Sequence, residues 1–192
     1  MSKHYRRLSL AQGASLCIVG LLAGLTLIVA ASRVKLFPIN ALFILAAWFC
    51  FWFFSHDLAH HVVGRIFGVG FRYYFFGRST ITKLNLPIAS NLLKVVSVLG
   101  LKTDKSSLKT VSPNGLRMMY ASGAVFSMFL PWVVIPAGFS IGRPVGILIT
   151  LLTLANVGFT LYFSTRVGDL HHARVVRSQV ESPIAIHSEA EG

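Results

Sequence analysis

The chain has 192 residues, of which 54% are hydrophobic and 12% are charged, and its mean hydropathy is +0.68. These values lie outside the usual range of soluble globular domains, so a water-soluble fold is not expected. A formal net charge of +12 also occurs in nucleic-acid-binding proteins, but the sequence contains no recognisable nucleic-acid-binding motif. Nucleic acid is therefore not expected as a partner.

Four apolar stretches reach the roughly 20 residues that a helix needs to cross the hydrocarbon core of a bilayer. They predict spans at about residues 11–32, 37–67, 118–139 and 145–165. The first stretch has the basic start of a signal peptide, but its apolar run is long for one, so we expect an uncleaved anchor. Residues 1–177 are thus predicted to form a single polytopic α-helical membrane domain.

Basic residues are unevenly distributed around these spans. Fifteen of the 18 Lys and Arg residues precede the first span, lie between Arg65 at the end of the second span and Arg117, or follow the fourth span, and three lie on the other side. Lys and Arg are retained on the cytoplasmic side during insertion. We therefore expect a multi-pass protein of the cell membrane with both termini in the cytoplasm, in contact with anionic membrane lipids.

The long loop between the second and third spans is predicted to contain structure of its own. Residues 71–76 are densely aromatic and follow turn glycines, which indicates a strand, and residues 80–84 are expected to pair with it as a β-hairpin. Residues 88–99 are mostly apolar but too short to span, which favours an interfacial helix. At the end of the chain, the polar and acidic residues 178–192 predict a flexible tail.

Acidic side chains are scarce, and the two nearest the spans both accompany histidines. Residues 56–60 read His-Asp-Leu-Ala-His, and Asp169 comes just before the histidine pair 171–172. An ionisable group inside a membrane costs at least a few kcal/mol, so it is retained mainly where it has a partner or a task. On a helix, His56 and His60 project from one face about one turn apart, which allows two imidazoles to bind one metal ion.

Simpler arrangements of the same residues are also open. Asp57 and His61 are four apart and could form a neutralising pair on the helix. Asp169 follows Gly168 and could cap a helix or pair with Arg166. Neither arrangement of Asp169 excludes metal binding, because a carboxylate at a helix break is well placed to complete a three-residue site.

The constellation resembles the site-2 protease family of intramembrane zinc metalloproteases, which have a His-Glu-x-x-His helix, a later glycine-containing helix and an Asp on a further helix. Residues 56–69 look like the zinc helix and its exit into a strand. Residues 121–127 are similar to the glycine-containing segment, and residues 156–170 to the stretch that supplies the third ligand. The resemblance covers about residues 37–174.

The resemblance implies that His56, His60 and Asp169 bind zinc and that Asp57 is the general base of a hydrolase that cleaves peptide bonds of membrane-spanning substrates. It also implies that an extended substrate segment docks on the aromatic strand, because an unwound peptide in a membrane must have its backbone groups paired. Substrate contacts are accordingly expected from Phe71, Tyr73, Phe75, Gly123 and Asn156.

Asp57 stands where the family has a glutamate, and it is one methylene shorter. Displacing a catalytic base by about 1 Å can cost on the order of 10²-fold in rate. A non-catalytic, metal-binding relative that acts as a membrane regulatory partner is therefore an alternative. The di-iron desaturases are a weaker one, because their His-Asp-x-x-His box belongs to a set of at least eight histidines. The sequence leaves the substrate and the oligomeric state open.

Overall fold

The computed structural model describes residues 6–78 and 97–181. Most of these residues are helical, and three short strands form one sheet. The helices are α1 (Leu10–Arg33), α2 (Phe37–Ile66), α4 (Pro113–Phe129), α5 (Val134–Ile141), α6 (Arg143–Ser164) and α7 (Asp169–Glu181), with 3-10 turns η2 (Ser107–Lys109) and η3 (Leu130–Val133).

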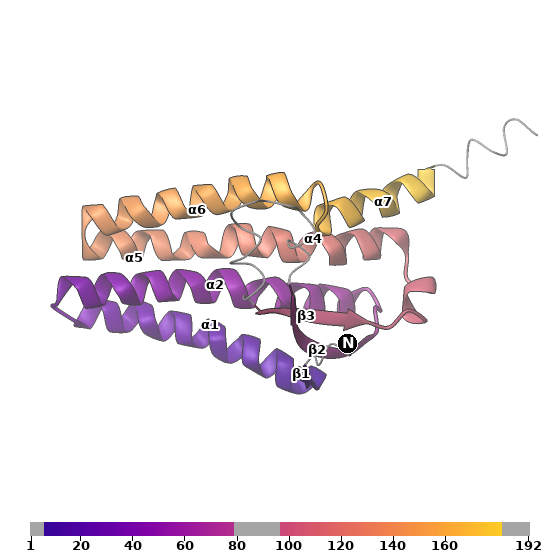
Figure 1. Ribbon diagram of the computed structural model, residues 1–192, viewed down its shortest axis with the longest axis horizontal. Coiled ribbons are helices and arrows are strands. Elements are labelled where there is room, and N and C mark those ends of the chain that lie inside the picture. The colour runs from indigo at the N-terminus through magenta and orange to yellow at the C-terminus, as the bar shows by residue number, and fades with distance from the viewer. Residues whose placement is uncertain (1–5, 79–96, 182–192) are drawn as a thin grey trace, which may run out of the picture.

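Four helical segments are long and apolar enough to cross a membrane: α1, α2, the continuous segment from α4 through η3 to α5, and α6. Figure 1 shows them side by side, with α1 next to α2, and α4 and α5 next to α6. Large apolar side chains such as Leu22, Leu42 and Leu151 are exposed on their outer surfaces. These features agree with the four predicted apolar helices and fit a membrane protein.

Local signals explain where these helices begin and end. Ser9 accepts a hydrogen bond from the backbone N–H of Gln12, whose side chain bonds back to Ser9, and this capping box starts α1. Gly68 has φ +85°, a left-handed conformation that suits glycine, and it ends the turn after α2. Pro131 in η3 cannot donate a backbone hydrogen bond, so the third predicted span is interrupted rather than one uniform α-helix.

The predicted aromatic strand is present as β2 (Phe71–Arg78), but its partners in the described residues are not those expected. It lies at the centre of an antiparallel sheet between β1 (Arg6–Leu8) and β3 (Ser97–Thr103). The expected hairpin partner, residues 80–84, lies outside the described residues. β1 precedes the first span and β3 follows the central loop, so the sheet joins segments that are distant in sequence.

Two other expectations meet the structure in part. Of the interfacial helix predicted over 88–99, residues 97–99 belong to β3, so that part of the prediction is wrong, and residues 88–96 lie outside the described residues. A short apolar run fits a strand as well as a helix, and here pairing with β2 decides. At the end of the chain, α7 extends to Glu181 and includes the first four residues of the segment predicted as a tail.

The sheet packs on α1 and α2 through its central strand. Tyr74 is 0% exposed, and its ring lies so close to Gly13 of α1 that a side chain there would overlap it. The Tyr74 hydroxyl lies 2.9 Å from Nδ1 of His61 on α2. In Figure 1 the sheet lies beside the end of α2, the part of the helix that carries the histidine box.

Candidate metal centre

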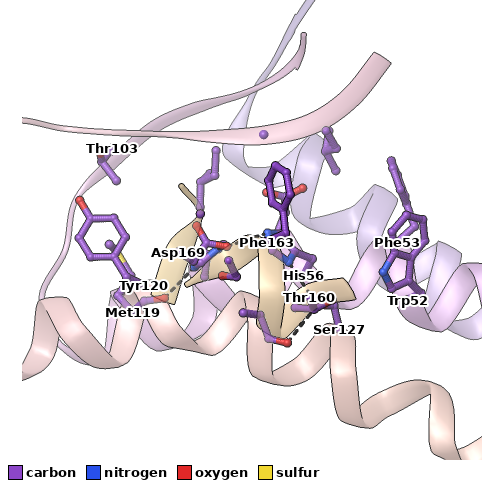
Figure 2. A pocket seen from close by; sticks show the side chains of 18 of the residues that line it. Trp52, Phe53, His56, Thr103, Met119, Tyr120, Ser127, Thr160, Phe163 and Asp169 are labelled. Atoms are coloured by element: carbon purple, nitrogen blue, oxygen red, sulfur yellow. Dashed lines mark hydrogen bonds and ion pairs between the residues drawn. The ribbon is translucent and has the colours of Figure 1, made fainter. Parts of the chain in front are cut away.

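Three side chains from two helices meet at one point. His56 and His60 lie one turn apart on α2, with ring centroids 4.9 Å apart, and Asp169 is the first residue of α7. Asp169 Oδ2 lies 3.3 Å from His56 Nε2 and 3.4 Å from His60 Nε2. One ligand atom from each of the three residues lies within 4.8 Å of the others. The structure therefore brings together the three predicted metal ligands, as Figure 2 shows for His56 and Asp169.

The break between α6 and α7 places Asp169 against the histidines. Ser164, the last residue of α6, accepts a hydrogen bond of 3.0 Å from the backbone N–H of Leu170. Gly168 packs so tightly that an added Cβ would lie 2.8 Å from the Cα of Ser164. Sequence reasoning missed Ser164, although a serine and a glycine on either side of a predicted helix break are a usable signal.

The other roles considered for Asp169 are not seen. Gly168, rather than Asp169, accepts the first α7 hydrogen bond, from the backbone N–H of His172 at 3.2 Å. Arg166 donates instead to the Tyr162 hydroxyl and stacks over that ring, so it forms no ion pair with Asp169 in the described part of the chain. The Asp169 carboxylate is thus directed to the two histidines.

The orientation of His60 is set by the backbone of α4. Its Nδ1 lies 2.7 Å from the carbonyl oxygen of Met119, and because a carbonyl only accepts, Nδ1 carries the proton. Gly123 of α4 packs against the ring near Nε2, where an added Cβ would overlap His60 Nε2 and the adjacent ring carbons. Backbone support of this kind is a common way to hold a metal-binding histidine.

The donor set fits a divalent metal ion. With its proton on Nδ1, a neutral His60 directs the lone pair of Nε2 at a carboxylate oxygen, which is favourable only if a proton or a cation lies between them. Ligands about 2.1 Å from a tetrahedral zinc ion lie about 3.4 Å from one another, close to the two distances to Asp169. Without a metal ion, protons can take the place of the cation: burial alone would raise the pKa of Asp169, but hydrogen bonds and charge from protonated His56 and His60 hold it below its ordinary value.

Asp57 lies beside the metal centre without belonging to it. Its side chain is buried, with 6% exposed, and it lines the same cavity as His56 and His60. The neutralising pair with His61 is not formed within the described residues, since His61 Nδ1 contacts Tyr74 instead. Asp57 therefore lies near the three ligands but projects from a different side of α2.

The three ligands open onto a cavity of about 620 Å³. Figure 2 shows it between β3, which carries Thr103, and α4, which carries Ser127. Its wall is largely aromatic: Phe49, Trp52, Phe53, Phe71, Phe75, Tyr120, Phe159 and Phe163. The polar ligands thus lie inside an apolar chamber, the usual composition of a ligand-binding site.

The residues expected to contact substrate fall in different places. Phe71 and Phe75 line the cavity, whereas the ring of Tyr73 lies under the guanidinium of Arg7, 4.9 Å from its centroid. Gly123 backs His60, and Asn156 donates a 2.9 Å hydrogen bond to the backbone carbonyl of Ser127. Gly123 and Asn156 therefore support the centre from behind, and in the described structure neither lines the cavity.

A second group of potential ligands is not found in the described residues. The group His56, His60 and Asp169 is the one identified there, and it has the size of a one-ion site. His171 and His172 are exposed on α7, and His172 packs against Tyr120. The part of the chain that the structure describes therefore lacks the paired ligand sets that a di-iron centre needs.

Comparison with known proteins identifies no relative of this chain. No protein-family model matches the chain, and no curated protein or solved structure matches it significantly. The site is accordingly interpreted from its own geometry: two histidines and an aspartate positioned to bind one metal ion, with a further buried aspartate beside them.

Proposed function

We propose that the protein is an intramembrane zinc metalloprotease-like hydrolase of the kind that the site-2 protease family represents. The observation that carries the proposal is the meeting of His56, His60 and Asp169 at one point, beside the buried Asp57, in a cavity between membrane-length helices. These are the ligand types of a catalytic zinc site, which keeps a fourth position open for water or substrate.

His56, His60 and Asp169 would hold the metal, and Asp57 would act on protons. A bound zinc ion would supply Lewis-acid chemistry by polarising the peptide carbonyl. Asp57 would accept a proton from the attacking water and transfer it to the departing amine nitrogen. Among the described residues that line the cavity, Asp57 is the one carboxylate outside the ligand set, which supports this role.

The edge strand β3 is the better candidate for docking an extended substrate segment. β2 is bonded to β1 along residues 74–76 and to β3 along its length, so its backbone is not available to a substrate there. Within the described residues β3 pairs on one side only, and Leu99, Gly100, Leu101 and Thr103 line the cavity. A peptide paired with β3 would keep its backbone hydrogen-bonded while passing the metal centre.

The distribution of charge supports a cell-membrane location with the metal centre near the cytoplasmic surface. The end of the bundle that carries the sheet and α7 is rich in basic residues, while Arg33, Lys35 and Arg143 lie at the opposite helix ends. Basic residues are retained on the cytoplasmic side. The basic residues at the sheet end include Arg6, Arg7, Arg65, Arg72, Lys102, Lys105, Arg117 and Arg166.

Cleavage of a membrane-spanning test peptide by wild type, Asp57→Ala and Asp57→Glu, with zinc content measured on the same samples, tests the proposal. We expect zinc in all three proteins, cleavage by wild type, and a loss of at least about 10²-fold in Asp57→Ala. Wild type and Asp57→Ala that are equally inert, with activity gained in Asp57→Glu, would make the chain a non-catalytic metal-binding relative. Two bound irons per chain would refute the zinc centre altogether.

A further inference from the structure

The two metal-binding histidines are oriented by different kinds of partner. His60 is held by a backbone carbonyl, that of Met119, which no substitution of a side chain removes. His56 Nδ1 faces a side chain instead, the hydroxyl of Ser127 at 3.5 Å. A side chain of α4, and not only its backbone, therefore faces the Nδ1 atom of His56.

The hydroxyl of Ser127 has its proton committed elsewhere. Ser127 Oγ donates a 3.1 Å hydrogen bond to the backbone carbonyl of Ala124, one turn earlier in the same helix. A hydroxyl has one proton to donate and lone pairs to accept with, so toward His56 this oxygen acts as an acceptor. An acceptor at that position requires the proton of His56 to be on Nδ1.

The surroundings hold Ser127 in this arrangement. Its side chain is 3% exposed, so bulk water does not compete for the hydroxyl. Asn156 of α6 donates its 2.9 Å hydrogen bond to the Ser127 backbone carbonyl, which ties α4 to α6 at this residue. Ser127 is thus fixed both in rotamer and in position relative to the metal centre.

We propose, building on the metal-binding role proposed above, that Ser127 is a positioning residue that selects the Nδ1–H tautomer of His56. The lone pair of His56 Nε2 is then directed at the same point as that of His60, where Asp169 Oδ2 lies 3.3 Å away. If Ser127 donated to Nδ1 instead, the proton of a neutral His56 would be on Nε2 and would block metal binding.

One other acceptor lies near His56, the backbone carbonyl of Gly123. If that carbonyl alone held the ring, removing the Ser127 hydroxyl would change neither the tautomer nor the affinity for metal. The two assignments therefore differ in what Ser127→Ala does.

The test compares wild type, Ser127→Ala, Ser127→Thr and Ser140→Ala in detergent. Ser127→Thr keeps the hydroxyl. Ser140→Ala is the matched control, because Ser140 donates the same type of bond to a carbonyl one turn earlier but is exposed on α5. The readouts are the proton on Nδ1 of His56, by ¹⁵N-histidine NMR of metal-free protein with His56→Gln for assignment, and zinc affinity by chelator competition.

We expect a proton on Nδ1 of His56 in wild type, Ser127→Thr and Ser140→Ala, a reduced population of Nδ1–H in Ser127→Ala, and zinc binding weakened about 10- to 100-fold in Ser127→Ala alone. A Ser127→Ala protein with an unchanged Nδ1–H population and unchanged zinc affinity would overturn the proposal and assign the role to the Gly123 carbonyl. A wild type that binds no zinc would refute the metal centre, and the NMR arm would then decide the Ser127 assignment separately.

Discussion

The two ends of the helix bundle are built differently, although the same membrane-length helices run through both. Away from the sheet, the core is a cluster of apolar side chains that includes a buried hydrogen bond from Trp48 Nε1 to Thr153 Oγ1 at 2.9 Å. At the sheet end, three ligand side chains converge beside a cavity, and Gly123 packs against the imidazole ring of His60. Close packing of apolar side chains stabilises the end away from the sheet. The sheet end instead keeps three ionisable ligands out of bulk water, which has a substantial desolvation cost.

This difference suggests that stability and metal binding are separable by position. Substitutions at the apolar end should change the stability of the bundle and leave the affinity for metal unchanged. Substitutions at the sheet end should do the reverse, or change both.

The largest effect on metal binding is expected from Gly123→Ala. The new Cβ would overlap the His60 ring, which cannot retreat because its Nδ1 is bonded to the Met119 carbonyl. Loss of a ligand should exceed the roughly 10- to 100-fold effect of altering its supporting shell, so we expect zinc affinity to fall by more than about 100-fold. Gly158→Ala is the control, since nothing lies within 4 Å of a Cβ there. Chelator competition gives both affinities, and equal values would show that His60 is not a ligand.

At the opposite end, Ile149→Ala should destabilise the bundle without affecting the metal. Ile149 is 0% exposed within the apolar cluster, and Ile147 on the same helix is 47% exposed. We expect a loss of about 2 kcal/mol for Ile149→Ala, the low end for buried positions, because lipid also solvates apolar surface in the unfolded state. Ile147→Ala should be close to neutral. Unfolding in detergent measures both, and a change in zinc content with Ile149→Ala would contradict the separation of the two ends.

The smallest effect is expected from Ser164→Ala, which removes the acceptor for the Leu170 N–H at the start of α7. Losing such a cap costs about 1 kcal/mol, which corresponds to about a fivefold loss of zinc affinity if it loosens Asp169. Ser112→Ala is the matched control, since Ser112 caps α4 through the Gly115 N–H. Isothermal titration of the three proteins should show weaker zinc binding in Ser164→Ala only. Equal weakening in both variants would mean that the effect is general instability.

The sequence predicted the helical framework well and the sheet poorly, for a physical reason. Apolar length follows from composition along the chain, so the four helices were recognised close to their observed bounds. Strand pairing depends on segments that are distant in the sequence. The local sequence of β1 (Arg6–Leu8) or of β3 (Ser97–Thr103) does not indicate that either strand pairs with β2. The strand expected to dock substrate is consequently the central one, and the sequence predicts a helix over part of the edge strand.

The pair of histidines on α2 was determined by the sequence alone, because a spacing of four on any helix brings two side chains to one face. What only the tertiary structure decided is what meets them there. Asp169 reaches Nε2 of both rings through the Ser164–Gly168 turn, while the Met119 carbonyl and the Ser127 hydroxyl face their Nδ1 atoms. These contacts join α2 to α4 and α7, and contacts between separate helices depend on how the bundle packs, which no local spacing encodes.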